Sequence, residues 1–392
     1  MTQRLKAEIG RLLEQVARLA DGPEQQAVAA HWQRYRSRVP SDRDESGPLF
    51  TLDVGIPTWS RVLGFDITAY NTNTLEHVRN DLRIRLEHQR RFHDDTLVGK
   101  ALSAPSFAGN LECSMLGAQI VFRSDTNPWA VTPGALVATE ADVAGLEMPD
   151  FHTAGEMPRV HRMWQETREL VQELGFGDWP VQFPQPIRGV LGLAQTMRGS
   201  YANLTLDMLD RPEFAAKLFR FAADFRFHYA RELARVTGEP IGRGNLNNDE
   251  VNTPSISPSL YAQFLLPLEA EISRFHGGLA LWHSCGDTSA LVPLIRQIPD
   301  IGWFYTGPWT RLDAVMAAFG DSVPIDIALN VVDDVLAASP GEMEAGIRRV
   351  VEGCAGAALK LRAGCVDSAF ELQADLAQCA RWCDVARRVL RR

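Results

Sequence analysis

Residues 282 to 287 read WHSCGD, so one residue separates His283 from Cys285. Imidazole nitrogen and thiolate sulfur are ligands that zinc prefers in proteins. Both residues come at the end of the apolar run GGLALWH, which has the length and composition of a buried strand. Residues i and i+2 of a strand share one face. The spacing therefore predicts that His283 and Cys285 point the same way at a strand end and could hold a metal ion.

A third ligand would have to come from elsewhere in the chain. Cys365 follows the run AALKLRAG in the same way, and Gly364 before it allows close backbone approach. If the strands close into a barrel, these ends meet at the catalytic rim. Two thiolates and one imidazole then leave one tetrahedral position open, as in catalytic zinc sites. Cys354 competes for this role, although it ends a helix at what should be the opposite face. Alternatively, these cysteines are buried as small hydrophobic residues.

Other candidate residues follow further expected strands. Asp249 and Glu250, in NLNNDEVN, could supply the fourth zinc ligand or a catalytic acid or base, or they could lie in a solvated loop. Trp303 and Tyr305 could form the wall of a substrate pocket, with core packing as the alternative for Trp303. The remaining candidate substrate-binding residues are Asp326, Asn330 and Arg198. A surface ion pair explains Arg198 equally well.

The elements that would position these residues alternate regularly after residue 185. Apolar runs predict strands, namely GGLALWH, IGWFYTG, VPIDIAL and GAALKLRA. Capping residues and first-turn prolines predict helices that begin at Asp210 to Pro212, at Ser257 and Pro258 (with a kink at Pro267), and at Ser339 and Pro340. Such alternation indicates an α/β fold with a parallel sheet. With two more strands from the N-terminal half, TLVGKAL and one that cannot be placed, eight would close a (β/α)8 barrel.

The N-terminal segment has a different pattern. Leu5, Ile9, Leu12, Val16 and Leu19 recur at steps of three and four, which predicts an amphipathic helix that covers the fold or forms a dimer. A polar connector, RSRVPSDRDESGP, follows it. We therefore expect a helical extension and connector over 1–48 and a single barrel over 49–392. A β-hairpin insertion is expected near 119–133, where an Asp-Thr-Asn-Pro turn separates two short apolar runs.

Composition excludes several classes of partner. The net charge of −9 provides no basic surface for nucleic acid or anionic membranes. No signal-peptide pattern and no long apolar segment occurs, so a soluble, cytoplasmic protein is expected. In such a protein the six cysteines are expected to be reduced thiols.

Beyond these patterns, the chain resembles a known family. The run ISPSLYAQFLLPLEAEISRFHGGLALWHSCGDTSALVPLI is similar to the uroporphyrinogen decarboxylase superfamily, in particular its zinc-dependent, corrinoid-linked methyltransferase branch. That branch binds zinc through a His-x-Cys pair and a distant Gly-Cys, which HSCG and AGC match at His283, Cys285 and Cys365. Weaker similarity covers most of the remaining chain, as in LGAQIVFRSDTNPWAVTP and LTLDMLDRPEFAAKLFRFAADF.

The resemblance implies a (β/α)8 barrel in which Zn²⁺ activates a substrate thiol for methyl or alkyl transfer, or polarises the substrate. It also implies a corrinoid (cobalamin) methyl carrier. The chain has no Asp-x-His-x-x-Gly corrinoid-binding motif, so the corrinoid would arrive with a partner protein or as a free cofactor. The substrate would be a small thiol or a methylated molecule, and a homodimer is a reasonable expectation.

Two departures limit the comparison. No arginine-rich, glycine-containing signature of the porphyrin decarboxylases occurs near RYRSRVPSD, and VDSAFE replaces the usual glycine- and proline-containing loop after Gly-Cys. Two alternatives therefore remain. One is a metal-independent decarboxylase or lyase that acts on a small carboxylate substrate. The other is a non-catalytic, ligand-binding barrel with a structural zinc.

Overall fold

The computed structural model describes residues 2–43, 46–132, 134–320 and 322–391. Positions 1, 44 and 45 of the expected extension, position 133 of the expected hairpin and position 392 lie outside the described residues. The strands are β1 (Leu49–Val54), β2 (Leu102–Ser103), β3 (Gln119–Val121), β4 (Trp129–Val131), β5 (Val181–Gln182), β6 (Gly244–Asn247), β7 (Leu279–Ser284), β8 (Ile301–Thr306), β9 (Ile325–Ala328) and β10 (Leu359–Val366).

Helices connect and cover these strands. They are α1 (Thr2–Ala20), α2 (Pro23–Arg36), α3 (Ile56–Leu63), α4 (Ile67–Thr72), α5 (Thr74–Phe92), α6 (Leu111–Met115), α7 (Glu140–Ala144), α8 (Met157–Glu173), α9 (Val190–Arg198), α10 (Tyr201–Asp210), α11 (Pro212–Thr237), α12 (Pro258–Leu260), α13 (Leu266–Phe275), α14 (Val292–Ile295), α15 (Leu312–Ala318), α16 (Pro340–Gly353) and α17 (Leu372–Leu390). Two segments are π-helical, η1 (Tyr261–Leu265) and η2 (Val331–Leu336).

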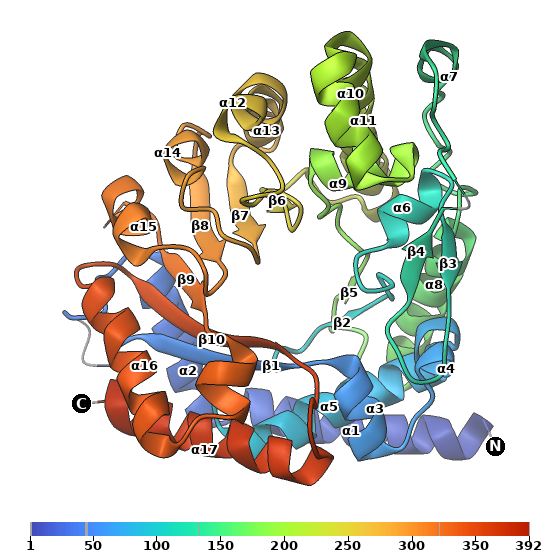
Figure 1. Ribbon diagram of the computed structural model, residues 1–392. Helices are drawn as coiled ribbons and strands as arrows, with labels where there is room; N and C mark the ends of the chain where they lie inside the picture. Colours follow the sequence, from blue (N-terminus) through green and yellow to red (C-terminus); the bar gives the residue numbers. More distant parts are fainter. Residues whose placement is uncertain (1, 44–45, 133, 321, 392) are drawn as a thin grey trace.

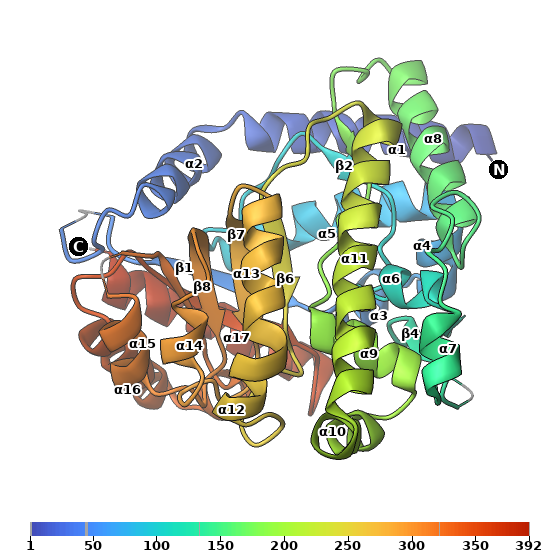
Figure 2. The same ribbon diagram turned by 90° about the horizontal axis from the view of Figure 1, so that it is seen from above.

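A parallel sheet forms the centre of the fold. Six strands of the described chain pair in the order β1-β10-β9-β8-β7-β6, and all these pairs are parallel. Figures 1 and 2 show the strands in a curved row with α13 to α16 on its outer side. The α/β class and the four strands expected after residue 185 are thereby confirmed.

Four further strands of the described chain form two separate pairs. Strand β2 pairs with β5 in parallel, and Arg188, beyond β5, forms a parallel bridge with Asn247 at the end of β6. Strands β3 and β4 form an antiparallel hairpin in the segment where two short strands were expected. The arrangement is compatible with a closed barrel.

Register places polar side chains in one row across the sheet. His283 pairs with Tyr305, Tyr305 with Asp326, and Asp326 with Lys360. Residues paired across neighbouring parallel strands point to the same face. One face of the sheet near its carboxyl end is therefore polar, although the strands are mostly apolar.

Some local expectations need correction. Of TLVGKAL only the last residue, Leu102, lies in a strand, and the strand that could not be placed is β1. Asp210 does not cap α11, because it is the last residue of α10; the N-cap is Arg211, without a side-chain hydrogen bond. The caps at Ser257 and Ser339 are confirmed. The expected interruption near Pro267 takes the form of η1, which ends just before it.

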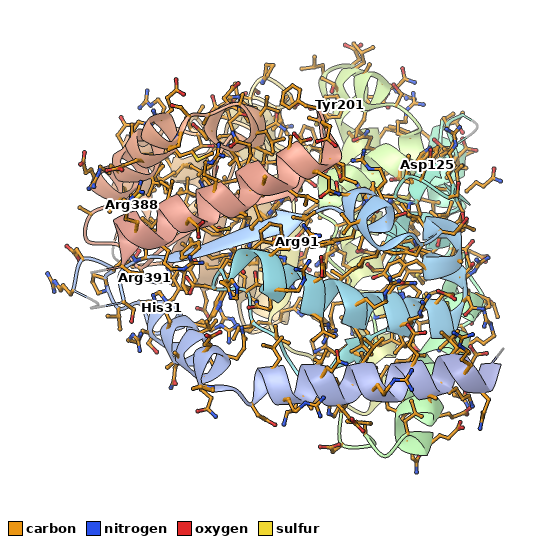
Figure 3. All side chains as sticks on the ribbon, turned by 90° about the horizontal axis from the view of Figure 1, so that it is seen from below. His31, Arg91, Asp125, Tyr201, Arg388 and Arg391 are labelled. Carbon is orange, nitrogen blue, oxygen red and sulfur yellow. The ribbon has the colours of Figure 1, made fainter. Side chains whose placement is uncertain are left out.

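Helix α1 covers the fold. Its buried residues Ile9, Leu13 and Val16 form an apolar cluster with Val78 and Leu82 of α5. Figure 3 shows α1 and α17 on either side of α5 on this face of the molecule. Because this apolar face of α1 is used within the chain, a homodimer would need another surface. Within the described residues, no helix has the length and apolar character needed to cross a membrane.

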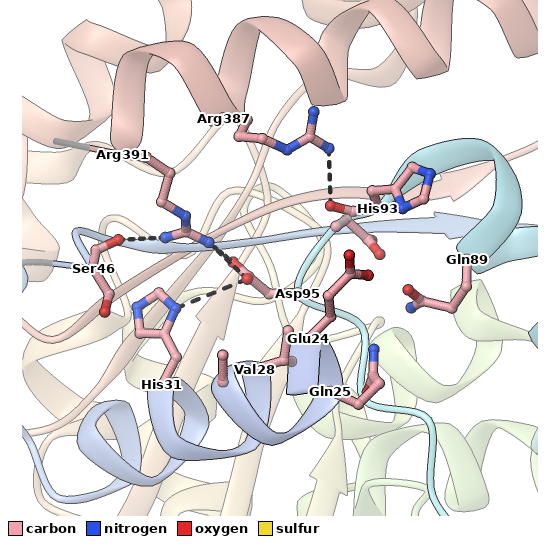
Figure 4. A pocket seen from close by; sticks show the side chains of 12 residues that line it. Glu24, Gln25, Val28, His31, Ser46, Gln89, His93, Asp95, Arg387 and Arg391 are labelled. Carbon is pink, nitrogen blue, oxygen red and sulfur yellow. Dashed lines mark hydrogen bonds and ion pairs between the residues drawn. The ribbon is translucent and has the colours of Figure 1, made fainter. Parts of the chain in front are cut away.

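Asp95 connects the beginning of the fold to its end. Its carboxylate accepts two hydrogen bonds from Arg391, at 2.5 and 2.6 Å (Figure 4). It also accepts one from the backbone N–H of Phe50 in β1 at 2.9 Å. The indole of Trp32 in α2 donates to the Asp95 carbonyl at 2.7 Å, and His31 lies 3.9 Å from the carboxylate. Burial raises the pKa of Asp95, but His31 and Arg391 outweigh it and hold the pKa below its usual value.

We predict that Asp95→Asn lowers the free energy of unfolding by about 3 kcal/mol, because it leaves Arg391 without its carboxylate partner in a buried setting. Urea unfolding followed by circular dichroism measures the change. Asp384→Asn is the control, because that carboxylate is exposed and its ion pair with Arg387 should contribute under about 1 kcal/mol. Equal losses in the two variants would contradict the role of Asp95.

Candidate metal centre

Three ligand atoms converge at the carboxyl ends of β6 and β7. One atom each from Asp249, His283 and Cys285 lies within 4.8 Å of the other two. The Nε2 atom of His283 is 3.0 Å from Oδ1 of Asp249 and 3.2 Å from Sγ of Cys285. His283 and Cys285 leave β7 on one side, as the i, i+2 spacing predicts. Nitrogen, sulfur and carboxylate oxygen form a donor set that suits zinc.

Charges at this group follow from its surroundings. Burial, together with the negative charge of Asp249, raises the pKa of the Cys285 thiol to about 12. Desolvation also raises the pKa of Asp249, but the hydrogen bond with His283 outweighs this and holds that pKa below its usual value. Without a cation the group therefore consists of a neutral thiol beside a carboxylate. A bound cation would favour loss of the thiol proton.

Cys365 lies near this group but not within it. It is exposed at the end of β10, and its φ of 57° is in the left-handed region. Its thiol is close enough to Cys285 to raise the pKa of that residue electrostatically. At Gly364 a Cβ would lie 2.9 Å from Cδ of Arg362, so the glycine leaves room for the arginine side chain. The structure thus brings two of the three expected ligands together with Asp249 and leaves Cys365 beside them.

The side chains of Tyr305 and Arg362 stack in turn on the imidazole of His283. The ring of Tyr305 lies parallel to it, with centroids 4.0 Å apart and planes at 16°. The guanidinium of Arg362 lies 5.2 Å from the centroid of the Tyr305 ring. Cation–π and stacking contacts of this kind fix ring orientation. Tyr305 therefore supports the histidine.

Arg362 is itself fixed by two carboxylates. It donates to Asp53 and, at 2.7 Å, to Asp326. Lys360 donates to the same Asp326 at 2.8 Å, and both Asp326 and Lys360 are almost fully buried. Desolvation would lower the pKa of Arg362, but these carboxylates outweigh it and raise the pKa. The guanidinium therefore remains charged.

The fold at this site is shared with a known enzyme. A methyltransferase from Methanosarcina mazei superposes with a TM-score of 0.64 over 91% of this chain and 98% of that chain, at 14% sequence identity. At this identity the likeness establishes the fold. The sequence itself matches no protein-family model and no curated protein.

The other expected site residues are dispersed. Glu250 pairs with Arg188 at 2.9 Å. Arg198 pairs with Asp207 at 2.5 Å, so the ion pair expected as the alternative is present, but both side chains are mostly buried and not at the surface. Asn330 caps η2 by accepting from the backbone N–H groups of Val332 and Asp333. Trp303 is half-buried in β8, upstream of Tyr305.

Sequence reasoning missed the residues that support the site. Lys360 and Arg362 are charged residues at i and i+2 in an apolar strand, a signal for paired charges on one inner face. Asp326 was expected to contact substrate, but it is fully buried and bonded to both of these cations. Its place in the structure is that of a support.

Glu269 supports the site from the opposite side. Its carboxylate accepts from Asn248 at 3.0 Å, Tyr261 at 2.8 Å and Trp282 at 2.9 Å. Asn248 and Trp282 directly precede Asp249 and His283. Burial raises the pKa of Glu269 to about 7, against the effect of these hydrogen bonds and of the nearby Arg226. Glu269 thus fixes two chain segments that carry the ligands.

We predict that Glu269 makes stability depend on pH. Its pKa is about 7 in the folded protein and roughly 4.3 in the unfolded chain. Between these values the folded state binds more protons, so its contribution to the free energy of unfolding falls as pH rises, by roughly 4 kcal/mol in all. Urea unfolding between about pH 5 and 8 should show this slope in the wild type. Glu269→Gln should remove it, and Glu271→Gln, at a half-buried position in an ion pair with Arg220, should retain it.

We predict that the ring of Tyr305 increases the affinity of the site for metal. Tyr305→Leu should weaken cobalt(II) or zinc binding by about tenfold, because the imidazole loses the ring that orients it. Tyr305→Phe keeps the ring and should stay within about threefold of the wild type. Competition with a chromophoric chelator measures the affinity, and the cobalt(II) visible spectrum reports ligand geometry. Equal affinities for the Leu and Phe variants would contradict a role for the stack.

Proposed function

We propose that the protein is a zinc-dependent methyl or alkyl transferase whose metal is held by His283, Cys285 and Cys365, with Asp249 in the fourth position of the resting enzyme until a substrate replaces it. The observation that carries this proposal is the convergence of the Asp249, His283 and Cys285 ligand atoms at the strand ends. The fold shared with a methyltransferase supports it. Cys365 lies near the end of another strand, β10, close enough to Cys285 to act on it electrostatically.

Bound zinc would lower the pKa of a substrate thiol, or polarise the substrate, so that a methyl or alkyl group can be transferred. The residues of the chain prepare the site for this chemistry. Tyr305 orients the imidazole of His283, and Asp249 keeps a charged carboxylate within 4.8 Å of the Cys285 sulfur. Asp249 Oδ1 is therefore a nearby base for a thiol proton.

Glu250 is the second proposed acid or base. Burial raises its pKa, and the ion pair with Arg188 opposes that rise. A raised pKa favours the protonated carboxyl group, which can act as a general acid. Trp303 and Tyr305 belong to the proposed wall of the substrate cleft. Tyr305 would both line the cleft and support His283. Arg198, Asp326 and Asn330 would stabilise the fold around the site and would not contact the substrate.

We also propose the finer architecture. Strands β1, β2, β5 and β6 to β10 would close as a (β/α)8 barrel over 49–392, with 1–48 as an extension and β3–β4 as an insertion. The parallel β2–β5 pair and the bridge from Arg188 to Asn247 support this proposal. The methyl carrier would be a corrinoid on a separate protein or free in solution, and the small substrate a thiol or a methylated compound.

Metal analysis tests the proposal directly. We predict about one zinc per chain by elemental mass spectrometry of protein purified without chelators. Cys285→Ser and His283→Ala should lose most of it, since each removes one ligand. Cys354→Ala is the matched control, because that thiol is buried at the end of α16 and outside the group. No zinc in protein from zinc-replete cells would overturn the proposal and favour the metal-independent lyase.

A further inference from the structure

A cavity adjoins the group of Asp249, His283 and Cys285 on the side of Cys365. This cavity, here called the side pocket, has a volume of about 360 Å³ and lies at the carboxyl ends of β1 and β2. Its lining includes Asp53, Tyr70, His77, Phe107 and Cys365. Cavities of this size take small molecules. The exposed thiol of Cys365 places such a molecule directly beside the proposed zinc ligands.

The backbone around the side pocket is strained. Phe107 and Ala108, both in its lining, have φ of 53°, and Cys365 has φ of 57°. Residues other than glycine adopt this conformation at a cost of roughly 1–3 kcal/mol each. Strain of this kind gathers at functional sites. The concentration of three such residues around one cavity is consistent with a ligand site.

Charge in the side pocket is negative. Among the described lining residues the charged side chain is that of Asp53, and neither lysine nor arginine occurs. The nearby cation, Arg362, lies between Asp53 and Asp326 and is bonded to both. Asp53, Asp249 and Asp367 all act on Cys365, against Arg362 alone. An anion placed here would meet more carboxylates than cations.

The other polar lining residues, Asn71, His77, Ser103, Ser106 and Asn127, carry no lysine or arginine charge that would favour an anion. Both ring nitrogens of His77 are bonded to backbone carbonyls, of Tyr70 at 3.0 Å and Ser103 at 2.9 Å. The partly exposed Tyr70 adds aromatic surface to the wall, whereas Phe107 is almost fully buried. Aromatic faces combined with a carboxylate recognise ammonium groups, methylated ones included.

We propose that the side pocket binds the substrate of the transferase as a small organic cation, an amine or methylated ammonium compound, and rejects carboxylates and sulfonates. This inference rests on the proposed function for the identity of the pocket as the substrate site. It adds the charge class of the substrate. Asp53 is the residue that determines the preference, with the Tyr70 side chain as the aromatic part of the wall.

The thiol of Cys365 makes the preference measurable. Three methanethiosulfonate reagents, trimethylammonioethyl, methyl and sulfonatoethyl, transfer cationic, neutral and anionic groups of similar size to a thiolate. Their rates at Cys365 are followed by peptide mass spectrometry in chelator-treated protein and divided by their rates with β-mercaptoethanol. The same thiolate attacks each reagent, so the fraction of Cys365 that is deprotonated cancels when the rate of one reagent is divided by that of another. We expect the cationic reagent to exceed the anionic one by about tenfold at low salt, and by less at high salt.

Variants identify the source of the preference. Asp53→Asn should lower the ratio at least about threefold, because it removes the pocket carboxylate and frees Arg362 from one of its two partners. Asp313→Asn, an exposed carboxylate paired with Arg311 in α15, should leave the ratio unchanged. A wild-type ratio of one or below at low salt overturns the proposal. So does an equal effect of Asp53→Asn and Asp313→Asn.

A binding measurement complements the labelling. Choline should slow the neutral reagent at Cys365 at concentrations where its uncharged isostere, dimethylbutanol, and acetate do not. Equal protection by all three would contradict a cation site. Zinc content is measured separately, so the two proposals can fail independently. If the protein contains no zinc but keeps the cation preference, the result contradicts the proposed zinc-dependent transferase. If the protein contains zinc but lacks the preference, the result contradicts the proposed cationic substrate.

Discussion

The pairing of buried charges on β9 and β10 is the constraint on which the site depends. Asp326 and Lys360 are almost completely removed from solvent, and each would be very costly alone. Two cations share the one buried carboxylate, and Arg362 turns outward to a second carboxylate, Asp53. This partition directs the guanidinium toward Tyr305, and through Tyr305 it orients His283. The pairing of these buried charges thus determines how the imidazole of His283 is oriented at the site.

A second support acts at the other edge of the group. Glu269 holds Asn248 and Trp282, so the β6 and β7 ends are fixed to one buried carboxyl group. The ligands therefore lie between two charged supports that make no contact with a metal themselves. Such outer contacts orient ligands and tune their basicity. The exposed Cys365, outside both supports, is the least constrained of the candidate ligands.

Several features that depend on neighbouring residues in the sequence were predicted correctly. Strand alternation correctly gave one face to His283 and Cys285, and the caps at Ser257 and Ser339 followed from side-chain chemistry. Long-range partners could not be predicted in this way. Arg198 and Asp326 were candidates for substrate contact because nothing in their neighbourhood revealed Asp207 or Lys360. Strand β1 was missed because its partner β10 lies more than 300 residues away, as in the pairing of Leu49 with Lys360. The zinc, the corrinoid and the role of Cys365 stay predictions.

The pairing of β1 with β10 also has a consequence for biosynthesis. The first strand of the sheet is synthesised more than 300 residues before its hydrogen-bonding partner, as the pairing of Leu49 with Lys360 shows. The ion pair of Asp95 with Arg391 has a similar sequence separation. Contacts of such sequence separation form slowly and leave strand edges open in the meantime. The β1 edge of the nascent chain therefore stays without its β10 partner until the roughly 300 intervening residues have been synthesised.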